Sequence, residues 1–268
     1  MLSPNTDSMG NSMKIATWNV NGINARTEHL LRWLKEFNPD VALLQELKTP
    51  GDAVPTLELK ELGYHVEFVG QKSFNGVAIL SKNEIDVVLD KLPGDEEDVQ
   101  SRYIEANTGG VRVASIYFPN GNPVDTEKFT YKLGFMERVI ERTKELLAEE
   151  IPFVLGGDYN VAPDNGDVYD IQKMGSDAIC REEGRQLYRK HLHMGLTNAY
   201  KLYHPEPGQF SWWDYRGGGW NKDHGVLIDH LLLSAQAADL LVDSNIDKTP
   251  RGWEKASDHT PVWCELSL

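Results

Sequence analysis

An apolar run over residues 152–155 ends in two glycines, and a carboxylate and an amide follow, Asp158 and Asn160. A short apolar run of this kind predicts a buried strand. The polar pair then lies at the end of a sheet, where loops carry reactive groups on a rigid support. A simple turn capped by Asn160 would explain these residues equally well if they stood alone. Whether Asp158 and Asn160 form a reactive site or a simple turn therefore depends on which residues follow the other predicted strands.

Three further polar clusters also stand at the end of apolar runs. They are Trp18-Asn19-Val20-Asn21-Gly22, Leu44-Gln45-Glu46 and Ser257-Asp258-His259. Together with Asp158 and Asn160 they supply mainly carboxylate and amide oxygens and one conspicuous histidine. Such hard ligands suit Mg²⁺ or Mn²⁺, which pair naturally with phosphate substrates, whereas zinc would need more histidine or cysteine.

One more carboxylate, Asp229, interrupts an apolar run over 226–234 that predicts a strand. A charge inside such a run costs several kcal/mol unless it has a partner. We expect a histidine to be that partner. The neighbouring His230 should point to the opposite face of the strand, because side chains alternate along a strand.

Strands and helices alternate along the chain without a Gly-rich nucleotide-binding loop. Strands are predicted over 14–19, 41–44, 65–69, 77–81, 85–89, 102–106, 111–118, 152–155 and 226–234, and from 259 onward; helices are predicted over 30–37, 57–62, 129–147 and 182–194. This order predicts an α/β fold with four layers, in which two packed mixed β-sheets are flanked by helices. The strand ends listed above would then share one region.

Composition places the chain among ordinary globular proteins. Its 268 residues are 40% hydrophobic and 25% charged, and no linker divides them. We expect a disordered extension over 1–12, which lacks the features of a signal peptide, and a single catalytic domain over 13–268. No apolar run approaches the ~18 residues of a membrane helix. Two cysteines, Cys180 and Cys264, indicate no disulfide framework and fit a reducing cytoplasm.

The formal charge of −14 argues modestly against a nucleic-acid substrate. Phosphate contacts are normally supplied by Lys and Arg. Net charge does not describe how the charge is distributed, however, and a magnesium site requires acidic ligands of its own. A nucleic-acid substrate therefore stays open.

The ordered combination of motifs resembles the exonuclease III family of apurinic/apyrimidinic endonucleases, within the wider endonuclease/exonuclease/phosphatase fold. The likeness runs from about Met13 to Leu268. Besides the four clusters above, it rests on Tyr-Phe-Pro-Asn-Gly at 117–121, Phe-Ser-Trp-Trp-Asp-Tyr-Arg at 210–216 and Ile-Asp at 228–229. The resemblance implies a DNase-like fold.

This resemblance also implies a function. The family cuts duplex DNA on the 5′ side of abasic sites and carries 3′→5′ exonuclease and 3′-end-cleaning activities, with Mg²⁺ as cofactor. We accordingly expect a cytoplasmic, monomeric DNA repair enzyme that acts on abasic sites or 3′ ends and in which Mn²⁺ can substitute for Mg²⁺. Membranes are not expected among its partners.

The site residues are carried over one by one from the same resemblance. The implied metal-site residues are Asn19, Glu46, Asp158, Asn160, Asp258 and His259, and the implied catalytic residues are Tyr117, Asp158, Asn160, Asp229 and His259. Glu46 is the principal ligand in this scheme. Asp158 orients or deprotonates the attacking water, and Asp229 holds the histidine that contacts the scissile phosphate.

A substrate pocket is implied as well. Trp212, Val226 and Ile228 correspond to its wall, which admits a sugar without its base but excludes an intact nucleotide. Arg102 corresponds to a position that contacts phosphate. Two features depart from the pattern: Leu227 stands where relatives often have a basic residue, and the loop over 120–123 has no basic side chain.

Two other functions remain open at this point. The same catalytic set could cleave a phosphoinositide or a sphingolipid, as in other branches of the wider fold. A non-catalytic DNA-binding protein could also keep the fold, although such proteins usually lose part of the catalytic set.

Overall fold

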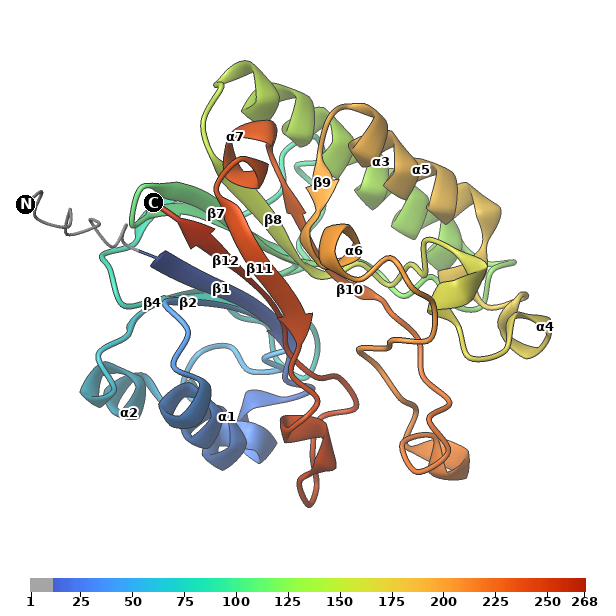
Figure 1. Ribbon diagram of the computed structural model, residues 1–268, viewed down its shortest axis with the longest axis horizontal. Coiled ribbons are helices and arrows are strands. Elements are labelled where there is room, and N and C mark those ends of the chain that lie inside the picture. The colour runs from blue at the N-terminus through green and yellow to red at the C-terminus, as the bar shows by residue number, and fades with distance from the viewer. Residues whose placement is uncertain (1–11) are drawn as a thin grey trace, which may run out of the picture.

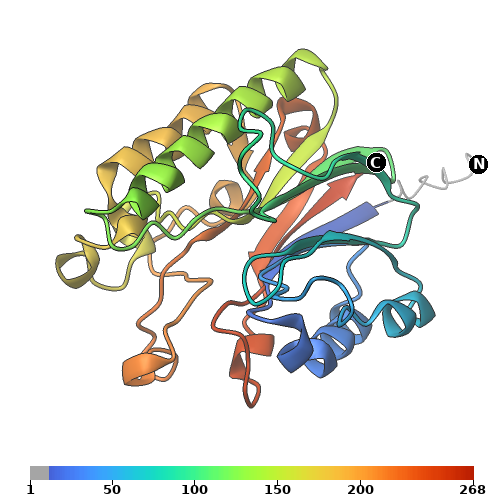
Figure 2. The same cartoon turned by 180° about the vertical axis from the view of Figure 1, so that it is seen from behind.

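A computed structural model describes residues 12–268, which form two six-stranded β-sheets packed face to face (Figures 1 and 2). The strands are β1 (Ser12–Asn19), β2 (Val41–Gln45), β3 (His65–Val69), β4 (Val77–Ser81), β5 (Asp86–Leu89), β6 (Tyr103–Thr108), β7 (Val111–Tyr117), β8 (Phe153–Asp158), β9 (Thr197–Asn198), β10 (Asp229–Leu233), β11 (Leu241–Ile246) and β12 (Val262–Ser267). The first sheet has the order β11-β12-β1-β2-β4-β3, and the second has the order β5-β6-β7-β8-β10-β9. Each sheet contains one parallel pair, β1 with β2 and β7 with β8.

Helices cover the outer face of each sheet. They are α1 (Ile23–Phe37), α2 (Thr56–Glu61), α3 (Glu127–Ala148), α4 (Ile171–Met174), α5 (Glu182–His193), α6 (Ala199–Tyr203) and α7 (Ala235–Ala238), with short 3₁₀ turns η1 (Asn165–Asp167), η2 (Ala178–Cys180), η3 (Arg216–Gly218) and η4 (Pro250–Gly252). In Figure 1, α1 and α2 lie beside the first sheet and α3 and α5 lie beside the second. The predicted four-layer α/β fold is confirmed.

Three apolar clusters hold these layers together. The central one lies between the sheets and includes Ile15, Leu43 and Leu231. A second joins the outer face of the second sheet to α3 and α5, and a third joins the outer face of the first sheet to α1 and α2. Because both faces of each sheet are covered, β2, β4 and β8 are buried along their whole length.

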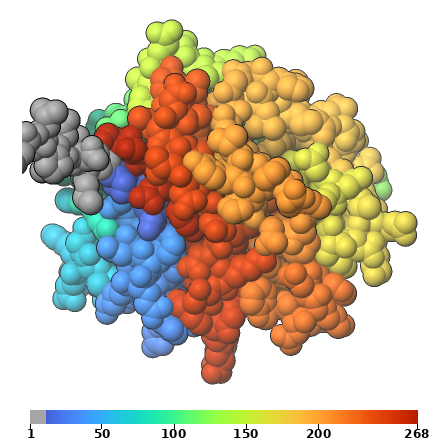
Figure 3. Space-filling model, in the orientation of Figure 1, coloured from blue at the N-terminus to red at the C-terminus, as the bar shows by residue number. Residues whose placement is uncertain are grey.

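Two loops project from one edge of the molecule, around η3 (orange) and around η4 (red) (Figures 1 and 3). They are connected at their base, where the hydroxyl of Tyr215 donates a hydrogen bond to the carbonyl oxygen of Ala256 at 2.8 Å. Both loops belong to the same edge as the strand ends described below.

Several boundaries differ from those predicted. The strand predicted over 226–234 begins only at Asp229, because Val226 forms isolated bridges with Trp212 and Val168 rather than a ladder. The final strand begins at Val262, and His259 precedes it in another isolated bridge with Trp212. Ser12, assigned to the N-terminal extension, is the first residue of β1, whereas 1–11 lie outside the described residues.

Within residues 12–268, no helix is both long enough and apolar enough to cross a membrane. Cys180 and Cys264 are both buried, and their thiols are free.

Candidate active site

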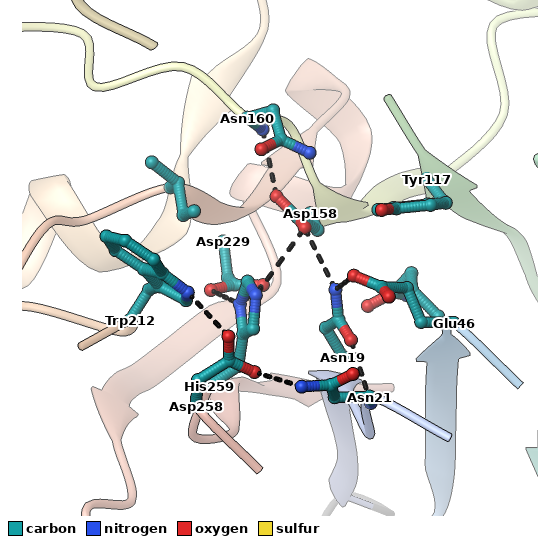
Figure 4. A network of polar contacts seen from close by, with 12 residues as sticks. Asn19, Asn21, Glu46, Tyr117, Asp158, Asn160, Trp212, Asp229, Asp258 and His259 are labelled. Atoms are coloured by element: carbon teal, nitrogen blue, oxygen red, sulfur yellow. Dashed lines mark hydrogen bonds and ion pairs between the residues drawn. The ribbon is translucent and has the colours of Figure 1, made fainter. Parts of the chain in front are cut away.

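The polar strand ends from both sheets meet on one side of the sandwich (Figure 4). Asn19 ends β1, and Glu46 follows β2, which runs parallel beside it. In the second sheet, Asp158 ends β8 with Tyr117 of β7 directly beside it. β10 runs antiparallel to β8, so its first residue, Asp229, lies opposite Asp158. Strand direction and register thus gather these side chains from distant parts of the chain.

The two glycines before Asp158 are needed for close backbone and side-chain packing. A Cβ atom on Gly156 would lie 2.5 Å from Cδ1 of Leu43 and 2.7 Å from Cδ2 of Leu231, where the two sheets meet. A Cβ atom on Gly157 would lie only 1.8 Å from the carbonyl oxygen of Ile116. Any side chain at these two positions would push the sheets apart or move β7 away from β8.

His259 is held by a carboxylate. Its Nδ1 lies 2.9 Å from Oδ2 of Asp229, which also accepts a 2.6 Å hydrogen bond from the hydroxyl of Ser211. The other ring nitrogen, Nε2, lies 3.7 Å from Oδ2 of Asp158. Asp229 thus has the histidine partner that its position in an apolar run required. It fixes the orientation of the imidazole, with Nε2 directed toward Asp158.

The surroundings of His259 and Asp158 raise the pKa values of both groups. Burial alone would lower the pKa of His259, but the charges of Asp229 and Asp158 outweigh it and raise the pKa to about 10. Burial, with the nearby charges of Asp229 and Glu46, raises the pKa of Asp158 to about 7, although His259 opposes this rise. At neutral pH the imidazole therefore carries a positive charge.

Glu46, Asp158 and His259 each offer one ligand atom, and these atoms lie within 4.8 Å of one another. The amide of Asn19 donates to Oε1 of Glu46 at 2.8 Å and to Oδ2 of Asp158 at 3.0 Å, so it bridges the two carboxylates. Burial would raise the pKa of Glu46, but the ammonium of Lys48, 2.8 Å from Oε2, holds it below its usual value. This arrangement of ionised oxygens fits a hard divalent cation.

The remaining residues of the predicted metal set lie around this group. Asp258 stands to one side, where it accepts hydrogen bonds from the amide of Asn21 at 2.8 Å and from Nε1 of Trp212 at 3.0 Å. The backbone N–H of Asn160 donates to Oδ1 of Asp158 at 2.9 Å. The side-chain oxygen of Asn160 accepts from the amide of Asn120 at 3.2 Å. Asn160 is thus placed to orient Asp158.

A small cavity of about 190 Å³ opens above these groups. Its lining residues are Glu46, Tyr117, Asn120, Asp158, Asn160, Asp177, Ile179, Trp212, Ile228, Asp258 and His259. Trp212 and Ile228 therefore lie where the pocket wall was predicted. Val226 does not line the cavity as predicted: it is fully buried and supports the wall from behind, through its bridge to Trp212 and its apolar cluster with Ile179 and Ile228.

Tyr117 and Arg102 lie against each other at the edge of the cavity. The guanidinium carbon of Arg102 is 4.7 Å from the centre of the Tyr117 ring, and Nη1 donates to the carbonyl oxygen of Tyr117 at 3.2 Å. Burial and the charges of Glu46 and Asp158 raise the pKa of Tyr117 well above its usual value, so its hydroxyl keeps its proton. Arg102 itself lines the adjoining groove, which shares Asn120 with the cavity.

Sequence reasoning missed several residues of the site. Asn120, Asp177 and Ile179 line the cavity, and Lys48 and Ser211 bind its carboxylates. Asn120 belongs to the Tyr-Phe-Pro-Asn-Gly motif at 117–121, and Lys48 stands two residues after Glu46, so both carried a weak sequence signal. Ser211 belongs to the motif at 210–216, whereas Asp177 and Ile179 are brought in by tertiary packing alone.

The two departures from the family pattern also have structural explanations. Leu227 is fully buried in the cluster between the sheets, so it is a core residue and lies away from the surface. The loop over 120–123 is fastened by Asn122, whose amide donates to Asp177 at 2.9 Å and whose side-chain oxygen accepts from the backbone of Ala178 at 3.1 Å. This loop supports the cavity.

Comparison with known proteins assigns this geometry to a family. A sequence profile of the endonuclease/exonuclease/phosphatase family matches residues 16–259. Exodeoxyribonuclease III of Haemophilus influenzae is 34% identical over 267 residues, which cover 95% of this chain and 100% of that protein.

Solved structures agree with this assignment. The 3′ phosphatase NExo from Neisseria, bound to a product DNA hairpin, has a TM-score of 0.92 and 38% identity, covering 96% of this chain and 100% of its own. An AP endonuclease from Archaeoglobus fulgidus has a TM-score of 0.90 and 35% identity, with the same two coverages. The relatives therefore include enzymes described by activity at 3′ ends and others described by activity at abasic sites.

Proposed function

We infer the function of this chain from its family: it belongs to the exonuclease III and AP endonuclease family of the endonuclease/exonuclease/phosphatase superfamily, and it is a DNA repair nuclease of that type. We propose that it hydrolyses phosphodiester bonds of duplex DNA on the 5′ side of abasic sites, and also removes nucleotides and blocking phosphates from 3′ ends, with Mg²⁺ as cofactor and Mn²⁺ as a substitute. The observation that carries the proposal is the grouping of Glu46, Asp158 and His259 under a small cavity with one apolar wall.

The donor atoms of this group fit a divalent cation. Glu46 and Asp158 would hold the cation, with Asn19 and Asp258 close enough to bind its water ligands. When bound, the cation would offset negative charge that gathers on the phosphate oxygens. We assign His259 to the phosphate rather than to the metal, because Nδ1 faces Asp229 and a protonated Nε2 has no lone pair to donate.

The protein groups have distinct roles in the proposed reaction, an in-line displacement at phosphorus. Asp158, whose pKa lies near neutrality, orients or deprotonates the attacking water, and the backbone N–H of Asn160 fixes its carboxylate. Protonated His259 donates to a phosphate oxygen from Nε2. The Tyr117 hydroxyl, which keeps its proton, donates to another oxygen or steadies the leaving group.

The cavity supports an abasic site as substrate. Ile179, Trp212 and Ile228 give it an apolar wall, against which a flipped deoxyribose without its base can pack. The adjoining groove carries Arg102 and Lys128 among several amides, and it offers cationic and polar donors to the DNA backbone despite the net charge of −14.

A panel of substrates tests the proposal. End-labelled duplexes carrying a tetrahydrofuran abasic analogue, a 3′ phosphate or an intact 3′ end would be incubated with the protein and Mg²⁺, beside phosphoinositide and sphingomyelin vesicles. We expect a single cut immediately 5′ of the analogue, release of the 3′ phosphate and slower shortening of the intact end. Phosphate or phosphocholine release from the lipids with uncut DNA would refute it, as would tight DNA binding without any cleavage.

A further inference from the structure

A buried lysine lies directly behind the catalytic cavity. Lys132 belongs to α3, and its side chain has no exposed surface. All three hydrogen-bond acceptors of its ammonium are backbone carbonyl oxygens, those of Asn160 at 2.6 Å, Asn120 at 3.1 Å and Ala178 at 3.3 Å. Burying an ammonium group whose hydrogen-bond partners are all uncharged costs free energy of folding. Packing alone therefore does not explain why a lysine occupies this position.

Each of the three carbonyls belongs to a different segment of the cavity wall. Asn120 follows β7, Asn160 follows β8, and Ala178 opens η2, directly before Ile179. Asn120, Asn160 and Ile179 all line the cavity. One ammonium group therefore ties together three loops, of which the loop after β8 and η2 are also joined by a backbone hydrogen bond from Ala162 to Ile179 at 2.9 Å.

The loop nearest to the chemistry is the one after β8. Asn160 has a left-handed backbone with φ of 49°, a conformation that costs energy for a residue other than glycine unless its surroundings fix it. Its N–H donates to Asp158, and its side-chain oxygen accepts from Asn120. A contact that fixes the carbonyl of Asn160 thus also fixes the donor that orients the Asp158 carboxylate.

The surroundings of Lys132 are shaped for an extended lysine side chain. A Cβ atom on Gly121 would lie 2.6 Å from Cδ of Lys132, so the turn at Gly121, with φ of 87°, leaves just enough room. Burial lowers the pKa of Lys132 to about 8, although Asp158 and Asp177 oppose the fall. The group is still protonated at neutral pH and can donate to all three carbonyls.

We propose that Lys132 is a positioning residue for phosphodiester hydrolysis: its ammonium holds the loops after β7 and β8 and the turn η2 in register, and thereby aims Asp158 and Asn120 into the cavity. The residue acts through the groups it holds and does not touch the substrate. The predicted effect on catalysis rests on the proposed function. The predicted effect of Lys132 on the loops is independent of that function.

Steady-state kinetics of K132M on the abasic duplex test the catalytic consequence. Methionine keeps the length of the side chain and removes the donors. We expect kcat to fall between about 10-fold and 10²-fold while KM stays within about 3-fold, because misplacing a catalytic group by about 1 Å costs rate rather than binding. K132R, which restores N–H donors, should recover part of the lost kcat.

Lys201 provides the matched control. Its ammonium binds the buried carboxylate of Asp167, away from the cavity lining. K201M should lower the melting temperature yet leave kcat unchanged. An unchanged kcat in K132M, or an equal loss of kcat in K201M, would overturn the proposal. If K132M does not fold, K132Q gives the same comparison.

Hydrogen exchange of the protein without DNA separates this idea from the proposed function. In K132M the peptides that contain 119–122 and 159–162 should exchange faster, while peptides from β2 and β4 keep the exchange of the wild type. Unchanged exchange in the two loops would overturn the role of Lys132 even if kcat fell. If the wild type cut no DNA at all, the proposed function would fail, and the exchange result would still decide whether Lys132 fixes the loops.

Discussion

Asp229 and Asp158 lie opposite each other on antiparallel strands, and the imidazole of His259 links them, with Nδ1 2.9 Å from Asp229 and Nε2 3.7 Å from Asp158. Two buried carboxylates this close would repel each other if both were ionised alone. The protonated histidine makes the pair tolerable and is itself kept charged by them. The register of β8 against β10 is therefore the origin of the electrostatics of the site.

Replacing Asp229 should change the pH dependence of the reaction. In D229N the pKa of His259 should fall, because the carboxylate that stabilises the imidazolium is lost. In the proposed reaction the protonated imidazole is the active form, so the variant should lose activity at a lower pH as the pH rises, whereas the wild type retains it toward pH 10. Single-turnover rates between pH 6 and 10 measure this. E145Q, which changes an exposed carboxylate, serves as the control. If D229N and the wild type lost activity at the same alkaline pH, the role of Asp229 would be contradicted.

Glu46 and Lys48 should have opposite effects on metal binding. E46Q removes an ionised ligand and should weaken Mn²⁺ binding at least about 10-fold. K48M removes the ammonium 2.8 Å from that ligand and should tighten Mn²⁺ binding, because one competing positive charge is lost. Isothermal titration of the protein without DNA measures both affinities. Equal affinities in all three proteins would place the cation elsewhere.

Trp212 should determine how tightly the abasic site binds. W212A removes one wall of the cavity and should raise KM for the abasic duplex about 10-fold or more. W212F keeps an aromatic wall and loses only the hydrogen bond from Nε1 to Asp258, so we expect a change of about 5-fold at most. Removal of a 3′ phosphate should suffer less in both variants. A W212A enzyme with normal KM would show that the sugar binds elsewhere.

Glu105 should matter for stability and not for catalysis. Its fully buried carboxylate accepts hydrogen bonds from Arg112 and Arg142 and from the hydroxyl of Tyr103. E105Q removes the fully buried carboxylate charge that two largely buried guanidinium groups share and leaves them the more exposed carboxylates of Glu145 and Glu149, so it should cost roughly 3 kcal/mol of the free energy of unfolding. Urea denaturation measures the loss, and kcat under native conditions should be unchanged. A loss below about 1 kcal/mol would mean that the arginines find other acceptors.

The parts of this protein that could be predicted from sequence share a physical cause. Strand ends are marked by an abrupt change from apolar to polar residues, so Glu46 and Asp158 could be located before their neighbours were known. The two-sheet architecture was predicted from the alternation of strands and helices along the chain, which the apolar periodicity marks in the same way.

The failures have a physical cause as well. An apolar run does not tell a strand ladder from isolated bridges, so Val226 was assigned to a strand and to the pocket wall, whereas it is buried behind Trp212. Lys132 lies within the helix predicted over 129–147, and its place in the sequence does not indicate burial. Its three acceptors come from loops that lie 12, 28 and 46 residues away along the chain, and only the folded structure brings them together.

The proposed function depends above all on Glu46, Asp158 and His259 forming a metal-dependent phosphodiesterase centre. The most direct test is single-turnover cleavage of an end-labelled duplex with one tetrahydrofuran analogue, with Mg²⁺ or with EDTA, by the wild type, E46Q and H259Q. We predict one cut immediately 5′ of the analogue, present only with the metal, and rates at least about 10²-fold lower in both variants. Cleavage in EDTA, or a normal rate in either variant, would contradict the account.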